Sequence, residues 1–375
     1  MLRFARVLMV AAAVLLLAEA AYLLMHGRRS APQQEPKVNI RQATAAAVAR
    51  SRDDMQSLRT VDERIVKYSL MRTIATGLDE PRGIALGRDG MLYVVGDKMM
   101  CIVDATSGEL KRRLELLDEP TCVSVDAAGS IHVGYRRFIE VYTSQGVLQT
   151  RWEALGARSY LTSIATGGGH VLAADAGARS VLHYDKWGVI QGRLGEPGSG
   201  AGPFSVPSPH FDVAITREGA LLVTNPGKHS VEIYSPEGTL VTSWGQTGQT
   251  IEGFCGCCNP TDIAVMADGR VVTSEKGLPR VKVYTAGGML DAVVAVPDDF
   301  STHAAGMDLA VDEAGHIWVL DPPEGVVKVF APKDAPAMPA ADAPAADLQP
   351  GGAQAPTAQT DAAPAEGSGA NTRNE

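Results

Sequence analysis

Three cysteines lie within four positions of the sequence, in the stretch GFCGCCNP at residues 253–260. The chain has five cysteines, so Cys255, Cys257 and Cys258 hold most of its sulfur chemistry. In an exported protein, thiols meet an oxidising compartment in which a disulfide is the usual state. Cys255 and Cys258 would then close a tight loop, or Cys257 and Cys258 would form a strained vicinal bridge that is more easily reduced.

Thiolates are also strong ligands for Zn²⁺, Cu⁺ and iron–sulfur clusters, which makes a metal site the second hypothesis for this stretch. Gly253 and Gly256 would let the backbone fold around an ion. Three cysteines leave a tetrahedral zinc one ligand short, so Cys122 or His210 would have to supply the fourth. A thiol that is active in disulfide exchange is the third hypothesis, and the Cys-x-Cys-Cys spacing does not decide among the three.

The cysteine stretch leads into one copy of an internal repeat, and this repeat predicts the fold. Each copy has an apolar segment, a Gly turn, a second short apolar strand, a polar loop and a third strand, which ends in an aromatic residue in the last five copies. The copies open at residues 81–90, 120–129, 161–170, 210–219, 260–269 and 306–315. Because each unit has room for four short strands, the repeat predicts an all-β, six-bladed β-propeller.

The two ends of the repeat region predict how the ring closes. The last copy stops after its third strand, at 326–330, and an orphan strand at 68–75 precedes the first copy. This orphan is similar to the fourth strands of other copies, so we expect it to complete the sixth blade. Closure of this kind hides sheet edges that would otherwise pair with other chains. Cys101 falls on a third strand and is expected to be a buried free thiol.

The repeat units PRGIALGRDGMLYVVGD and PTDIAVMADGRVVTSEKGLPRVKVY resemble the NHL repeat of six-bladed propellers, over about residues 68–330. The segments YLTSIA, SPHFDVA, NPGKHSVEIY and FCGCCNP also resemble a group of uncharacterised, membrane-anchored bacterial NHL proteins. The resemblance implies the propeller fold and a place at a membrane. It implies no activity, because propellers serve as enzymes, scaffolds and binding modules alike.

One position of the repeat gathers polar side chains at the start of the first strand of each blade. In chain order it holds Gly83, Cys122, Ser163, Asp212, Asp262 and Asp308. First strands line the channel of a propeller, so three adjacent blades would place carboxylates near one channel mouth, with His210 beside them. Two interpretations stay open: the carboxylates bond backbone amides of a neighbouring blade, or they bind a hard cation such as Ca²⁺.

Long loops are expected to surround the same channel mouth. The segments that enter blades four, five and six, at 195–208, 245–259 and 295–305, all open on this rim. Lys276 and Arg280 add positive charge there, where they would bind an anionic ligand or pair with Glu275. The acids and the amide that follow each second strand fit the turn chemistry of the repeat and are expected to be structural: Asp175, Asn225, Glu275 and Asp321.

The segments outside the repeat indicate location. Residues 1–29 carry Arg3 and Arg6 near their start and continue with an apolar run of the length that spans a bilayer, which favours a signal anchor with the propeller outside the cytoplasm. The Ala18-Glu19-Ala20 triplet leaves cleaved secretion as the alternative. Residues 30–67 are expected to form a linker and a stalk helix, residues 68–331 the propeller, and residues 332–375 a disordered Ala/Pro-rich tail.

Composition and motifs indicate which classes of function fit this chain. The net charge of −9 and the absence of a basic stripe argue against nucleic acid as a partner. The sequence has no Gly-x-Ser-x-Gly motif and no evident Ser/His/Asp set. We therefore expect a membrane-tethered binding or scaffold module whose channel rim at blades four to six contacts a protein or a small molecule. The alternatives are a metal-dependent propeller enzyme of lyase or lactonase type, and a redox or metal-binding accessory protein that uses the CGCC loop. No cofactor is certain, and Ca, Zn, Cu or Fe–S at the rim are the candidates.

Overall fold

The computed structural model describes residues 59–195, 202–301 and 303–334. The expected anchor at 1–29, most of the expected linker and stalk at 30–67, and nearly all of the expected tail at 332–375 lie outside the described residues. Within the described part of the chain, no helix is long and apolar enough to cross a membrane.

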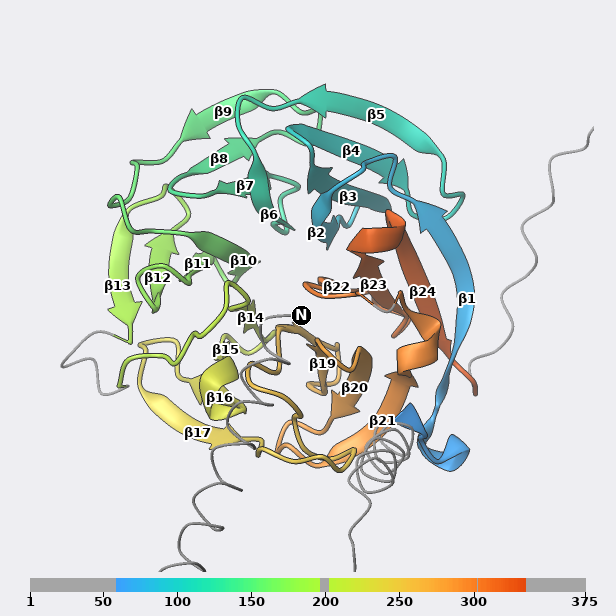
Figure 1. Ribbon diagram of the computed structural model, residues 1–375. Helices are drawn as coiled ribbons and strands as arrows, with labels where there is room; N and C mark the ends of the chain where they lie inside the picture. The colour runs from blue at the N-terminus through green and yellow to red at the C-terminus, as the bar shows by residue number, and fades with distance from the viewer. Residues whose placement is uncertain (1–58, 196–201, 302, 335–375) are drawn as a thin grey trace, which may run out of the picture.

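The described strands form six four-stranded antiparallel sheets that are arranged radially around a common axis (Figure 1). The all-β, six-bladed propeller that the repeat predicts is thereby confirmed. Among the described residues there are four short 3₁₀ helices: η1 (Glu63–Ile65) precedes the first strand, and η2 (Pro226–Lys228), η3 (Pro297–Asp299) and η4 (Pro322–Glu324) lie between strands.

Each blade runs from an inner first strand to an outer fourth strand. Blade one has β2 (Pro81–Leu86), β3 (Met91–Gly96), β4 (Met99–Asp104) and β5 (Leu110–Glu115), and blade two has β6 (Pro120–Val125), β7 (Ile131–Tyr135), β8 (Ile139–Tyr142) and β9 (Leu148–Arg151). Blade three has β10 (Leu161–Gly167), β11 (His170–Asp175), β12 (Ser180–Asp185) and β13 (Ile190–Leu194), and blade four has β14 (Val213–Ile215), β15 (Leu221–Asn225), β16 (Ser230–Tyr234) and β17 (Leu240–Trp244). Blade five has β18 (Asp262–Val265), β19 (Val271–Glu275), β20 (Arg280–Tyr284) and β21 (Leu290–Ala295), and blade six has β22 (Leu309–Val311), β23 (Ile317–Asp321), β24 (Val326–Pro332) and β1 (Tyr68–Ala75).

Ring closure joins the N-terminal strand to the last repeat. Strand β1 pairs antiparallel with β24, from Tyr68 opposite Pro332 to Ala75 opposite Val326. Figure 1 shows β1 as the outermost strand of blade six, beside β24. The orphan strand therefore has the role that the sequence predicts, and the first and last repeats share one sheet.

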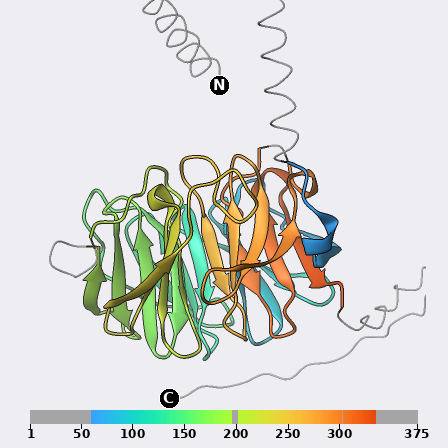
Figure 2. The ribbon, with the colours of Figure 1, turned by 90° about the horizontal axis from the view of Figure 1, so that it is seen from below.

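The hydrophobic core lies between neighbouring blades. Figure 2 shows the ring of blades from the side. Every residue of β7, β15, β19, β20 and β23 is buried. The outer strands β5 and β9 are largely exposed. Middle strands are covered on both faces by adjacent sheets, which explains why their polar residues are buried along with their apolar ones. Cys101 on β4 is fully buried and free, as expected.

Candidate functional site

Strand register confirms the ring of equivalent positions at the start of the first strands. Gly83 lies opposite Val95, Cys122 opposite Gly134, Ser163 opposite Ala174 and Asp262 opposite Ser274. Asp212 and Asp308 directly precede β14 and β22, and their carbonyl groups accept hydrogen bonds from the second strands of their own blades. A channel cavity of about 230 Å³ is lined by four ring residues, Cys122, Ser163, Asp212 and Asp308, together with apolar first-strand side chains.

Two of the ring carboxylates join neighbouring blades. Asp212 accepts a hydrogen bond from the backbone N–H of Ile263 in blade five, at 2.5 Å. Asp308 accepts one from the backbone N–H of Ile84 in blade one, at 2.7 Å. Each carboxylate uses its second oxygen for the N–H of the residue that follows it in the chain. Of the two interpretations drawn from the sequence, the structural one therefore holds for Asp212 and Asp308, since buried N–H groups require such partners.

Asp262 differs from the other two carboxylates because it bonds within its own blade. Its Oδ2 atom accepts a hydrogen bond from Ser274 Oγ at 3.0 Å. Burial, followed by the charge of Asp212, raises the pKa of Asp262 to about 7. The same desolvation raises the pKa of Asp212 to about 6 and holds that of Asp308 well above its ordinary value. The channel carboxyls therefore bind protons more readily than ordinary aspartates near neutral pH.

The geometry does not support a preformed cation site at this ring. Among the described residues, no group of three His, Cys, Asp or Glu side chains is arranged to hold a metal ion. Two of the carboxylates already accept two backbone N–H groups each. Cys122 is part of the channel wall, where burial raises its pKa to about 12, so its thiol stays protonated.

A second cavity, of about 290 Å³, opens at the channel mouth on the rim with the long loops. Its walls are formed by Pro81, Arg82, Thr121, Tyr160, Thr162, Pro209, His210, Phe211, Asp262, Ala305, Gly306 and Pro322. The structure thus brings His210 and Asp262 into one cavity, as the sequence predicts. Burial, followed by the nearby charge of Lys276, lowers the pKa of His210 to about 4, so its imidazole is neutral at pH 7.

Four residues that line this cavity were not predicted from the sequence, although their position in the repeat could have identified them. Arg82, Thr121, Thr162 and Phe211 each come directly before a ring position. Successive residues of a strand point in different directions, so the preceding residue does not share the environment of the ring residue. Reading the repeat one position earlier would have identified these four side chains.

The acids and the amide after the second strands hold the entry loops, which confirms their structural role. Each accepts a hydrogen bond from a backbone N–H of the loop that enters its own blade: Asp175 from Tyr160, Asn225 from Ser205, Glu275 from Cys255 and Asp321 from Ser301. These four bonds span 2.9–3.3 Å. The rim loops of blades three to six are therefore pinned to buried strands at equivalent points.

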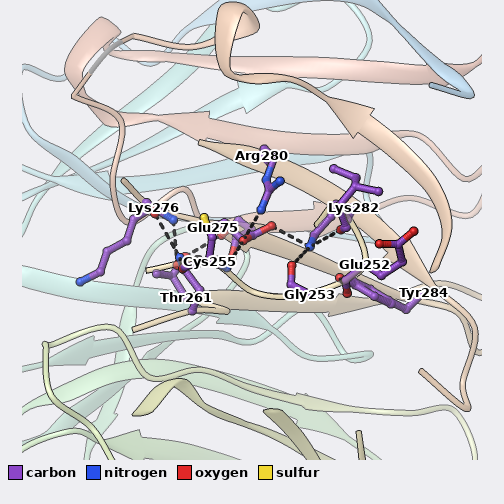
Figure 3. Close-up of polar contacts among 12 residues, drawn as sticks. Glu252, Gly253, Cys255, Thr261, Glu275, Lys276, Arg280, Lys282 and Tyr284 are labelled. Atoms are coloured by element: carbon purple, nitrogen blue, oxygen red, sulfur yellow. Dashed lines mark hydrogen bonds and ion pairs between the residues drawn. The ribbon is translucent and has the colours of Figure 1, made fainter. Parts of the chain in front are cut away.

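Blade five strengthens this arrangement with a buried ionic cluster (Figure 3). Glu275 forms ion pairs with Arg280 at 2.9 Å and with Lys282 at 2.8 Å, and all three side chains are 0–1% exposed. Lys282 also donates hydrogen bonds to the carbonyl oxygens of Ile251 and Gly253 in the entry loop. Burial lowers the pKa of Lys282 to about 8, although Glu275 acts in the opposite direction.

The cluster corrects one expectation about the rim. Arg280 was expected either to bind an anionic ligand or to pair with Glu275, and it pairs with Glu275 inside the blade. At 1% exposure its side chain does not reach the rim. Lys276 does lie at the rim, where its Nζ donates to Ser208 Oγ at 2.7 Å.

The GFCGCCNP loop is held by hydrogen bonds. All five cysteines are free thiols, so neither of the disulfides considered from the sequence is formed in this structure. The side chain of Asn259 donates to the carbonyl oxygens of Cys255 and Lys276 and accepts from the N–H of Lys276. Together with the Cys255–Glu275 bond, these contacts fix both ends of the cysteine stretch. Of its three thiols, the structure brings two together, Cys257 and Cys258, whose Sγ atoms lie 2.9 Å apart.

Comparison with known proteins supports the fold. No protein-family model matches the chain, and no curated protein matches its sequence. The structure is similar to that of selenomethionine-substituted virginiamycin B lyase from Staphylococcus aureus, with a TM-score of 0.52 and 14% sequence identity over 70% of this chain and 99% of that chain. The two proteins share the propeller fold. At this identity the likeness extends to the fold alone, and the NHL resemblance stays a prediction.

Proposed function

We propose that this protein is a membrane-tethered binding module outside the cytoplasm, which holds its ligand at the channel rim of blades four to six. The proposal rests on one observation: a cavity of about 290 Å³ at the channel mouth lies among loops that are pinned to the buried strands. A surface that is ordered before binding loses little conformational entropy when a partner docks. Such a rim suits recognition.

The cavity beside the loops of blades four to six is lined by residues from all six blades, and these residues indicate what kind of group would enter. Tyr160, Thr162 and neutral His210 offer hydrogen bonds, and Pro81 and Phe211 offer apolar surface. A few polar groups on apolar walls are typical of sites that take one small molecule or one side chain of a larger partner. Arg82 lies at the same mouth, where it pairs with Glu80 at 3.4 Å and with Glu119 at 3.8 Å, so a polar group is the best fit.

An enzyme is the second candidate, and one observation favours it. The mouth cavity holds a histidine whose pKa is about 4 and an aspartic acid whose pKa is about 7. Near pH 7 the carboxyl is present in both its protonated and its ionised form, which is the condition that general acid–base chemistry uses, and the neutral imidazole in the same cavity can accept a hydrogen bond. The lyase neighbour shares only the fold, so it adds no argument for a particular reaction.

The membrane tether and the NHL assignment are part of the proposal and rest on the sequence. The apolar run within residues 1–29 and the flanking arginines support the tether. The six repeat units support the NHL assignment. An exported propeller on a short tether would hold its rim near the membrane surface, within reach of other envelope proteins or of small molecules there.

Photo-crosslinking of the full chain in its native host tests the proposed binding face. A benzophenone amino acid replaces Ala305, an exposed residue at the rim cavity, or Ala127, an exposed residue at the cavity of the opposite channel mouth. We expect light-dependent adducts at position 305 and few at position 127. Equal labelling at both positions, or labelling at position 127 alone, would refute the binding face proposed here.

A further inference from the structure

The Cys257–Cys258 pair is a feature that the proposed binding role does not use. Its two Sγ atoms lie 2.9 Å apart. Side chains of successive residues point to opposite sides in an extended chain, so this approach requires a bend. The backbone bends at residues 256–258, and Gly256 adopts a φ of 80°, a left-handed conformation that glycine accepts without steric cost. The local fold therefore places two neighbouring thiols face to face.

The two thiols differ in their access to solvent. Cys257 is exposed, whereas Cys258 is 3% exposed. Thiol–disulfide exchange needs one thiol that a co-reactant can reach and a second that can attack the mixed disulfide from within. The pair meets this requirement, with Cys257 as the accessible thiol and Cys258 as the resolving thiol.

The hydrogen bonds that hold the loop do not involve the sulfur atoms of Cys257 or Cys258. Asn259 and Glu275 fix the backbone on both sides of the pair, and Lys282 holds the preceding segment. Because none of these hydrogen bonds uses either thiol, the cysteine pair can change its redox state without breaking them. The same anchors keep the two Sγ atoms close together, which favours reaction between them over reaction with a second external molecule.

We propose that Cys257 and Cys258 form a thiol–disulfide exchange site whose co-reactant is a small organic disulfide. The Cys257 thiolate attacks one sulfur of the co-reactant, whose S–S bond breaks, and the first released thiolate takes up a proton. Cys258 then loses its proton and attacks the Cys257 sulfur, which breaks the mixed disulfide and releases the second thiolate, and this takes up the proton from Cys258. Two protein thiols are thereby oxidised to a Cys257–Cys258 disulfide, and one external disulfide is reduced to two thiols. An excess of small thiol reverses both steps.

The electrostatics of the pair sets the conditions of the test. The hydrogen bond with Cys258 raises the pKa of Cys257, with burial acting in the same direction and the charge of Lys276 acting against both. Because the thiolate is the attacking species, exchange is slow at neutral pH and is best followed in mildly alkaline buffer.

Mass spectrometry of the full-length protein after incubation with glutathione disulfide tests the proposal. We expect the folded wild-type chain to lose two hydrogen atoms, to retain no glutathione, and to yield a peptide with Cys257 linked to Cys258. The C258S variant should instead accumulate a single glutathione adduct on Cys257. The C257S variant should not react at Cys258 while folded.

The C255S variant is the matched control, because it removes the neighbouring thiol of the same loop. We expect it to form the Cys257–Cys258 disulfide at the wild-type rate and yield. Three results would overturn the proposal: a link to Cys255, a glutathione adduct that persists on the wild-type chain, or oxidation of the pair only after unfolding in urea.

Discussion

Asp308 of blade six accepts a hydrogen bond from the backbone N–H of Ile84 in blade one, at 2.7 Å. This bond crosses the point at which the last repeat meets the first. Strand β1 closes the same junction on the outside of the ring by pairing with β24. The propeller is therefore closed at two places: strand β1 closes its outer edge, and the Asp308 carboxylate closes the ring at the channel.

Removing the hydrogen bond between Asp308 and Ile84 should lower the free energy of unfolding. In Asp308→Ala the N–H of Ile84 loses its acceptor in a crowded part of the channel, so we expect a loss of about 1–3 kcal/mol in the free energy of unfolding. Asp308→Asn keeps an acceptor oxygen and should cost less. Urea denaturation of both variants measures the difference. If the alanine variant were as stable as wild type, the hydrogen bond between Asp308 and Ile84 would not contribute to stability.

The channel carboxyls should make the folded state more stable in mild acid than at neutral pH. The pKa of Asp262 rises from an ordinary 3.8 to about 7 on folding, and that of Asp212 rises to about 6. A raised folded-state pKa contributes stability that is complete below the unfolded value and is lost as the pH rises through the folded value. The contribution of this pair should therefore decline between about pH 4 and about pH 7.

The variant Asp262→Asn checks this pH dependence, because it keeps the side-chain shape and removes the titration. We expect its free energy of unfolding to change less with pH than that of wild type over the same window, and to exceed wild type at neutral pH and above. Parallel curves for the two proteins, measured by urea denaturation across the pH series, would show that Asp262 titrates normally.

The buried lysine of blade five should be a strong determinant of loop order. In Lys282→Met the carboxylate of Glu275 loses one of its two cationic partners and keeps Arg280 and the backbone N–H of Cys255. The carbonyl groups of Ile251 and Gly253 lose their donor. Breaking a buried ion pair in this way typically costs about 3–5 kcal/mol. We also expect faster amide hydrogen exchange in residues 245–259.

Lys276→Met is the matched control for this substitution, because Lys276 lies at the rim of the same blade. Its bond to Ser208 is partly solvent-accessible, so we expect a change of about 0–1 kcal/mol. Similar losses for the two lysine variants would mean that burial of the Glu275 cluster does not hold the entry loop.

The proposed tether predicts how the protein fractionates. The full chain should remain with membranes after alkaline carbonate extraction, because an apolar span is not released by high pH or salt. A chain that begins at residue 30 behind a cleavable export signal should be recovered in the soluble extract. Release of the full chain by carbonate would contradict the anchor and favour cleaved secretion.

The repeat explains why so much of the fold was predictable from the sequence. Six similar units impose the same four-strand pattern, so the ring position of Asp212 and Asp308 and the structural role of Glu275 followed from alignment of the chain with itself. Conservation of strand register carries such predictions from one blade to the next.

The remaining features depend on side-chain environments that the repeat does not specify. The sequence places the charge of Arg280 on the rim face, yet Arg280 lies two residues from Lys282 on one face of β20, and both reach Glu275. A period-of-two argument would have placed them together. The pairing of Cys257 with Cys258 depends on a local bend at Gly256, which residue spacing does not determine.

The central claim is that a ligand occupies the rim cavity, and a steric block tests it most directly. A benzophenone amino acid at Tyr160 reports on the occupant, and Ala305→Trp places a large side chain at an exposed position of the same cavity. Ala127→Trp makes the same change at the opposite channel mouth. We predict that the yield of light-dependent adduct at position 160 falls at least about tenfold with Ala305→Trp, as expected for a loss of about 1.4 kcal/mol in binding, and stays at the wild-type level with Ala127→Trp. An adduct yield that is unchanged by Ala305→Trp, or reduced equally by both substitutions, would contradict the claim.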